Sequence, residues 1–177
     1  MESRRKRKRS QITKWVCYAL LMLLCTVLQT LPGLFRLGEA KPLWLLPLAL
    51  AVAVEEGEFA GGIFGAVCGL MWDYTAGRTA GLLAFELLLL CFLLSAVMQL
   101  YFKTSAANVV LLETAAVLLV LSLDWLFFYY MPGYSWALSR WLTFVLPSAM
   151  MTLVPSLVLF SLVRCIYNEF KIDNGVI

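Results

Sequence analysis

The hydropathy pattern of the chain consists of six apolar runs that are separated by short polar segments. The runs cover residues 15–34, 42–54, 59–72, 80–102, 108–130 and 141–166. As helices rising 1.5 Å per residue, four of them are long enough to cross a hydrocarbon core of about 30 Å. The second and third runs are short, so they are either two tilted spans, which we favour, or a re-entrant pair. The pattern predicts an all-α, polytopic membrane protein with about six transmembrane helices in one bundle.

Composition leaves little room for a soluble domain. The chain of 177 residues is 62% hydrophobic and only 14% charged, whereas soluble domains carry about 25% charged residues. The charges are also segregated along the chain. We therefore expect a basic N-terminal arm at 1–14, a transmembrane helical bundle at 15–166 and a short C-terminal tail at 167–177.

The distribution of basic residues predicts the orientation of the bundle. Seven of the fourteen Lys and Arg residues lie in 1–14. With this arm in the cytoplasm, six spans would also place Lys103, Arg164 and Lys171 inside, and Arg36, Lys41, Arg78 and Arg140 outside. This bias agrees with the positive-inside rule. It predicts a multi-pass protein of the plasma membrane with both termini cytoplasmic.

Small residues recur every four positions through the third run. The series is Gly57, Gly61, Gly65, Gly69, Asp73, Gly77 and Gly81. On a helix, residues four apart share a face, and bare glycine lets another helix backbone approach closely in a membrane. The series predicts a helix-packing face, used inside the protein or by a partner helix, that ends in a carboxylate.

The role of Asp73 has two possible interpretations. Arg78 follows five residues later, so we favour the interpretation that Asp73 is an interfacial acid and pairs with this arginine across a short loop. The alternative is a contact for a partner or a ligand at the outer face.

Three further acids lie inside apolar runs, where ionisable groups are costly and usually face the bundle interior. Glu113 and Asp124 are eleven residues apart, which places them within about 20° of each other around a helix and about 16 Å apart along it. We favour an inward packing face over a proton or cation path. Glu86 is a lone acid whose partner the sequence does not indicate.

Glu55, Glu56 and Glu58 form an acidic segment between the second and third runs. A solvated cytoplasmic turn is the favoured interpretation, and pairing with the basic arm or with a cytoplasmic partner is the alternative. The arm itself indicates membrane topology and attraction to anionic lipid in the bilayer. A short arm tethered at the bilayer does not favour nucleic-acid binding.

Residues with catalytic or ligating chemistry are scarce. The chain has no histidine, and its five cysteines include no C-x-x-C pair. Nucleophile–histidine pairs and imidazole metal ligands are therefore excluded, and no nucleotide-binding or protease motif occurs. We expect no enzyme activity, no catalytic residue, no cofactor and no metal.

The segment 42–101 resembles the MreD family, rod-shape-determining membrane proteins of bacteria. It contains the proline-led run PLWLLPLALAVAVEEGE and then GGIFGAVCGLMWDYTAGRTAGLLAFELLLL. The family's glycine-rich third helix ends in G-L-x-x-D, here Gly69 to Asp73, and a G-L pair opens the next helix, here Gly81-Leu82. Chain length, basic N-terminus and number of spans also agree.

The resemblance implies a non-catalytic membrane scaffold of the cell-wall elongation machinery. Such a protein would bind the membrane-anchored periplasmic protein MreC. It would thereby help to couple cytoplasmic MreB filaments, indirectly, to a RodA-type glycosyltransferase and a penicillin-binding transpeptidase in peptidoglycan synthesis.

The alternative is the substrate-binding membrane subunit of an energy-coupling-factor vitamin transporter, which is also a small helical bundle. Asp73, Trp72 and Arg78 would then line an outward-facing pocket. Such subunits often carry A-x-x-x-A on the first helix. Here Leu23 follows Ala19 at that spacing, so the motif is missing.

Overall fold

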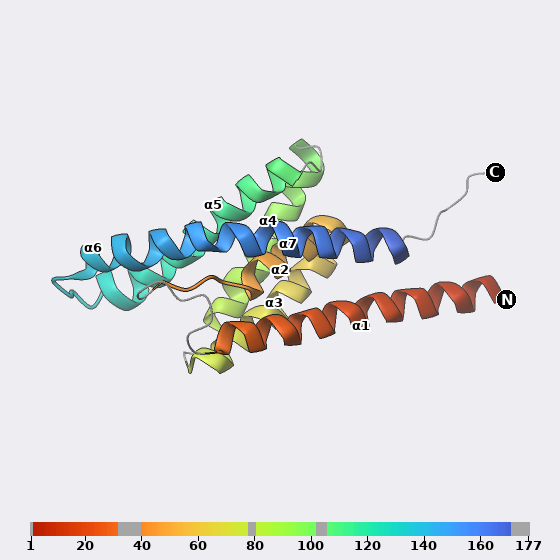
Figure 1. Cartoon of the computed structure of the whole chain (residues 1–177), viewed down its shortest axis with the longest axis horizontal. Coiled ribbons are helices and arrows are strands. Elements are labelled where there is room, and N and C mark those ends of the chain that lie inside the picture. The colour runs from red at the N-terminus through yellow and green to blue at the C-terminus, as the bar shows by residue number, and fades with distance from the viewer. Residues whose placement is uncertain (1, 32–39, 78–80, 102–105, 171–177) are drawn as a thin grey trace.

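The computed structural model describes residues 2–31, 40–77, 81–101 and 106–170, and its regular elements are helices (Figure 1). They are α1 (Glu2–Thr30), α2 (Leu45–Glu56), α3 (Glu58–Ala76), α4 (Leu82–Tyr101), α5 (Ala106–Trp125), η1 (Leu126–Tyr130), α6 (Ala137–Arg140), η2 (Trp141–Val145) and α7 (Leu146–Phe170). The π-helical stretch η1 continues α5, and α6, η2 and α7 follow one another without a break. Six helical segments therefore correspond to the six apolar runs, which confirms the all-α prediction.

Four of these segments have the length and the composition of membrane spans. Within the described residues they are Arg9–Thr30, Leu82–Leu100, Asn108–Tyr130 and Ala137–Phe170. Several long apolar helices in one chain define a polytopic membrane protein. Neither α2 nor α3 belongs to this set. At 1.5 Å per residue the 12 residues of α2 reach only about 18 Å.

Helix α2 lies at the centre of the molecule. Its residues from Leu45 to Ala53 are all buried, and it contacts α1, α3, α4, α5 and α7. A helix that is apolar on every side is stable only when it is enclosed, and this helix is uniformly apolar until Glu55. The core of the protein is thus built around its shortest apolar segment.

The other helices surround α2 in neighbouring pairs. Helices α3 and α4 run along each other, α5 packs against α7, and α1 lies beside α7, α2 and α3. Figure 1 shows that α1 begins and α7 ends at the same end of the molecule. The chain therefore returns to the side from which it started.

The basic arm is not separate from the first span. Helix α1 begins at Glu2 and continues without a break to Thr30. The helix is continuous for a local reason, because Lys, Arg and Gln are good helix formers and no proline or glycine occurs before Pro32. The expected division at residue 14 rests on charge and on the side of the membrane, and it stays a prediction.

The connection between the last two long segments is rich in aromatic contacts. The backbone N–H of Met131 donates to the carbonyl of Leu126, the i to i−5 bond of a π-helix. The Trp125 indole N–H donates to the carbonyl of Ala137 across the hairpin at 2.7 Å. The Arg140 guanidinium lies 5.2 Å from the Tyr129 ring centroid. These contacts hold the two segments together at the turn.

Candidate functional site

The glycine face of α3 is occupied by neighbouring helices of the same chain. A Cβ added to Gly61 would overlap with the Cα atom of Ala53 in α2. A Cβ added to Gly69 would lie 2.5 Å from the Cα atom of Ala84 in α4. Backbone atoms cannot retreat in the way that the end of a flexible side chain can. The face is therefore an internal contact of α3 with α2 and α4.

The seven-residue series predicted from the sequence does not lie on one helix. Gly61, Gly65, Gly69 and Asp73 lie in α3, whereas Gly57, Gly77 and Gly81 lie outside it. Gly57 has φ 92° and separates α2 from α3, while Gly77 has φ 63° and ends α3. A positive φ is favourable for glycine alone among common residues, and the left-handed conformation of Gly77 is a frequent helix terminator. The same residue type therefore serves packing at some positions and chain reversal at others.

Asp73 holds the turn between α3 and α4. Its side chain is 3% exposed, and its Oδ2 atom accepts a hydrogen bond of 2.8 Å from the backbone N–H of Gly81. This N–H precedes α4, where the helix dipole favours a carboxylate. The expected partner Arg78 lies outside the described residues. The vitamin-transporter alternative would place Asp73 in the lining of an outward-facing pocket, whereas the residue is buried and bound to Gly81.

The two acids of α5 are both buried. Glu113 is 2% exposed and Asp124 is 6% exposed. Glu113 accepts a hydrogen bond from the Ser156 hydroxyl of α7, so its carboxylate lies between the two helices. Both residues are therefore buried in the bundle, and they lie on one helix at the spacing of eleven residues that gives a shared face.

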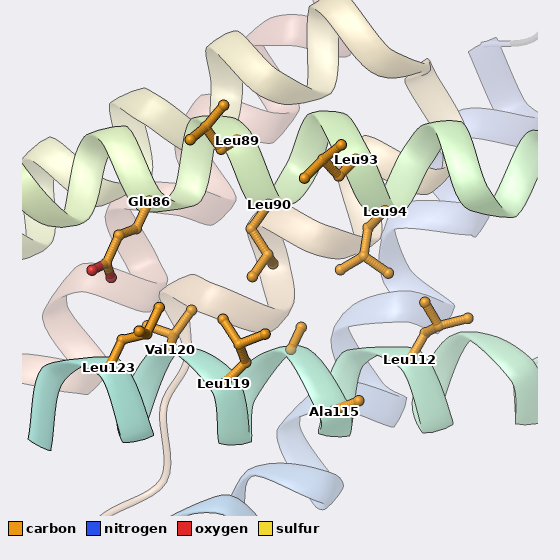
Figure 2. Close-up of a pocket in the computed structure, with 11 residues that line it drawn as sticks. Glu86, Leu89, Leu90, Leu93, Leu94, Leu112, Ala115, Leu119, Val120 and Leu123 are labelled. Atoms are coloured by element: carbon orange, nitrogen blue, oxygen red, sulfur yellow. The ribbon is translucent and has the colours of Figure 1, made fainter. Parts of the chain in front are cut away.

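Glu86 has a different setting, in a groove between α4 and α5. The groove has a volume of about 410 Å³ and is otherwise lined by Leu, Ala and Val side chains. Figure 2 shows the Glu86 carboxylate pointing from α4 toward Leu123 of α5, with Leu90 and Leu119 further along the same space. Glu113 does not line this groove, whereas Asp124 and Asp73 are close enough to Glu86 to act on it electrostatically.

The acidic segment at 55–58 is only partly a turn. Glu56 ends α2, and its Oε2 atom lies 2.7 Å from the Lys14 Nζ atom. The Tyr18 hydroxyl donates to the Oε1 atom of Glu56 at 2.8 Å, and the Lys14 Nζ atom also lies 5.4 Å from the Tyr167 ring centroid. The favoured prediction of a solvated turn is wrong for Glu56, which pairs with the basic arm.

Two polar residues that sequence reasoning did not single out support the start of α2. The Gln29 Oε1 atom accepts hydrogen bonds of 3.1 Å from the backbone N–H groups of both Trp44 and Leu45. The Thr152 hydroxyl oxygen accepts from the N–H of Leu43 at 3.1 Å. The first N–H groups of a helix lack partners within the helix, and a bilayer offers no water to replace them. The one available signal was a glutamine inside an apolar run.

The chemistry of these residues is structural. Within the described residues, no three His, Cys, Asp or Glu side chains come together as a metal-binding group. The free cysteines Cys25, Cys68 and Cys91 are buried, where they act as small apolar side chains. Asp73, Glu113, Glu56 and Gln29 each bind another part of the chain and thereby fix the packing of the helices.

Fold and site together define a small polytopic membrane protein whose polar residues organise helix packing. Residues 9–170 match the family model described as rod shape-determining protein MreD. The match extends over far more than half of the chain, so the protein belongs to the MreD family. No curated protein and no solved structure matched the chain.

Family membership gives the coarse function. The MreD family consists of non-catalytic membrane proteins that determine cell shape. The chain therefore has a role in rod-shape determination and cell-wall elongation, and the prediction that it is not an enzyme is confirmed.

Proposed function

We propose that this protein is a membrane scaffold that helps to couple MreB filaments, through an MreC-like protein, to the enzymes of peptidoglycan synthesis. The family match across the whole bundle carries the proposal. The partners are an MreC-like membrane-anchored protein, a RodA-type glycosyltransferase and a penicillin-binding transpeptidase. MreB-type filaments are reached indirectly.

The scaffold crosses the plasma membrane six times, with both termini in the cytoplasm. Helix α2 is short, but the non-helical residues 42–44 precede it and add up to about 10 Å to its length of about 18 Å. The 19 residues of α3 reach about 28 Å. Both lengths approach the hydrocarbon thickness of about 30 Å. The start of α1 and the end of α7 lie at the same end of the molecule, which also supports an even number of crossings (Figure 1).

The glycine face and Asp73 serve this scaffold by fixing its shape. Gly61 and Gly69 bring α2, α3 and α4 into backbone contact, and Asp73 closes the turn between α3 and α4. A partner would therefore meet a rigid surface and bind without first ordering it, which lowers the entropic cost of assembly. Contact of a partner with the glycines themselves stays a prediction.

Depletion of the protein in its own rod-forming organism tests the proposed function. We expect the cells to become round, with nascent peptidoglycan no longer inserted along the cell length. The measurement is microscopy of cell shape and of fluorescently labelled new wall, with re-expression of the intact chain as control. Cells that keep their rod shape and their insertion pattern after complete depletion would contradict the proposal.

A further inference from the structure

Helices α4 and α5 leave a groove between them because each is held by a different neighbour. Helix α4 lies against α3 at Gly65 and Gly69, where a Cβ would meet Cys91, Leu87 and Ala84. Helix α5 is bound to α7, where Glu113 accepts the hydrogen bond of Ser156. The contacts between α4 and α5 themselves are few. The space between them, about 410 Å³, therefore follows from how the rest of the bundle packs.

The walls of the groove are apolar and open to the surroundings. Leu93 of α4 is 59% exposed and Leu119 of α5 is 51% exposed, and both line it. Figure 2 shows side chains of the two helices facing each other across the gap. Exposed leucines alone would be ordinary for a lipid-facing surface, so the walls do not identify what fills the groove.

Glu86 distinguishes this groove from a lipid-facing surface. It lies four residues after the start of α4, and its carboxylate points into the groove (Figure 2). Its Oε2 atom is buried and has no hydrogen-bond partner within the part of the chain that the structure describes. A carboxyl group in a bilayer without a partner is costly. The groove therefore presents an acceptor that lacks a donor.

We propose that this groove binds one membrane-spanning helix of a partner protein, which places a hydrogen-bond donor beside Glu86. The inference rests on the proposed function, because the occupant is a membrane-anchored component of the same machinery. The donor is the side chain of a Lys, Arg, Ser, Thr, Asn or Gln residue about one turn inside the membrane. Apolar residues of the partner fill the space between Leu93 and Leu119.

A helix fits these observations better than a lipid or a second copy of the chain. Lipid acyl chains would fill the apolar part of the groove, but the donors of a lipid belong to its headgroup, and none lies at the depth of the acyl chains beside Glu86. A second copy presenting the same groove would set one Glu86 against another, and like charges repel. A partner helix supplies both the apolar surface and the donor, and interhelical hydrogen bonds stabilise helix association in membranes.

Site-specific photo-crosslinking of the full-length protein in its native membrane tests the groove. A photoreactive amino acid replaces Leu119, which lines the groove, or, as control, Leu111 of the same helix. Leu111 is 71% exposed and does not line the groove. We expect position 119, and not position 111, to give an adduct with one membrane protein. Mass spectrometry should place the adduct in a spanning helix with a donor residue at the depth of Glu86.

Variants of Glu86 test the role of its carboxyl group in the same assay. Glu86→Leu removes the acceptor and should lower the adduct yield at position 119 about three- to tenfold, the effect of one interhelical hydrogen bond. Glu86→Gln retains an acceptor and should keep most of the yield. Phe85→Leu, an exposed neighbour outside the groove, should leave the yield unchanged. Protein amount in the membrane is measured for each variant.

Several results would overturn the proposal. The first is that position 119 gives adducts only with lipid or with a second copy, or that positions 111 and 119 give equal adduct yields. The second is that the adduct lies outside a spanning helix of the partner. The third is that Glu86→Leu leaves the adduct yield at position 119 unchanged. The crosslinking at position 119 needs no variant of Glu86, so it decides the matter even if Glu86→Leu fails to fold. Round cells after depletion combined with lipid adducts would retain the proposed function and reject the groove.

Discussion

At the scale of single residues, the protein depends on the absence of side chains at a few positions. Helix α3 lies so close to α2 and α4 that a methyl group would not fit without displacement at Gly61, Gly65 or Gly69. In a bilayer there is no hydrophobic driving force between helices, so packing at close range provides much of the association energy. These glycines therefore contribute to stability although they bury almost no side-chain surface.

Gly69→Ala should destabilise the protein by about 1–3 kcal/mol, the usual range for overpacking. The added methyl would meet the backbone of Ala84 and Leu83 at under 3 Å. Gly62→Ala is the matched control on the same helix, because its nearest contact would be 3.5 Å from the Leu88 carbonyl oxygen. Thermal unfolding in detergent measures both variants. Equal midpoints for the two variants would contradict the assignment of Gly69 to a tight contact.

The surroundings of a polar side chain could be predicted from the sequence only where the residues involved are near one another in the chain. Helical geometry placed Glu113 and Asp124 on one face, and the cost of an acid in a bilayer favoured the interior for that face. The pairing of Glu56 with Lys14 and Tyr18 did not, because 42 and 38 residues separate these groups. Local sequence gives no register between α1 and the end of α2, so the solvated interpretation of Glu56 was the natural one and was wrong.

At the scale of elements, α2 is the helix that depends most on others. It is short, uniformly apolar and enclosed, and its first N–H groups bind Gln29 and Thr152 from α1 and α7. Non-helical backbone at membrane depth is tolerated only where other protein groups satisfy it. The start of α2 thus links three helical segments.

Gln29→Leu should lower the free energy of unfolding by about 1–3 kcal/mol, because the buried N–H of Leu45 and the partly buried N–H of Trp44 lose their common acceptor. The amide of Leu45 should also exchange its hydrogen faster, which hydrogen–deuterium exchange detects. Gln11→Leu serves as control, because Gln11 is exposed and lies on the same helix α1 as Gln29. Unchanged exchange at Leu45 in the Gln29→Leu protein would show that this bond is not needed at the start of α2.

The glycine series also shows a limit of predicting helix boundaries from residue spacing. A spacing of four residues predicted one continuous face from Gly57 to Gly81. The structure ends α3 at Ala76, since Gly77 adopts the left-handed conformation. Spacing alone cannot separate a glycine that continues a helix from one that terminates it, because both uses exploit the same missing Cβ.

At the scale of the whole molecule, we predict that both termini lie on the same side of the membrane. The chain forms six helical segments, and the start of α1 and the end of α7 lie at the same end of the molecule (Figure 1). Single cysteines at Gln11, Ser139 and Asn168, all exposed, test this prediction. Exposed Cys165 and half-buried Cys17 are first replaced, while the buried Cys25, Cys68 and Cys91 can remain.

A membrane-impermeant maleimide should label Ser139→Cys in intact cells, and should label Gln11→Cys and Asn168→Cys only after lysis. The reason is the excess of basic residues at the N-terminus, which retains that end in the cytoplasm. Labelling of Gln11→Cys and Asn168→Cys from opposite sides would mean an odd number of crossings and would contradict the six-span arrangement.

The sequence by itself determined that the chain is a bundle of membrane helices without catalytic chemistry, and which segments are helical. These properties depend on hydropathy and on residue types, which act locally against the bilayer. The segment 42–101, together with chain length, basic N-terminus and number of spans, also indicated the MreD family. Only the tertiary structure decided that α2 is the centre, that Gln29 and Thr152 support it, and that α4 and α5 leave a groove beside Glu86. Each of these depends on contacts between segments far apart in the chain, for which the local pattern carries no register.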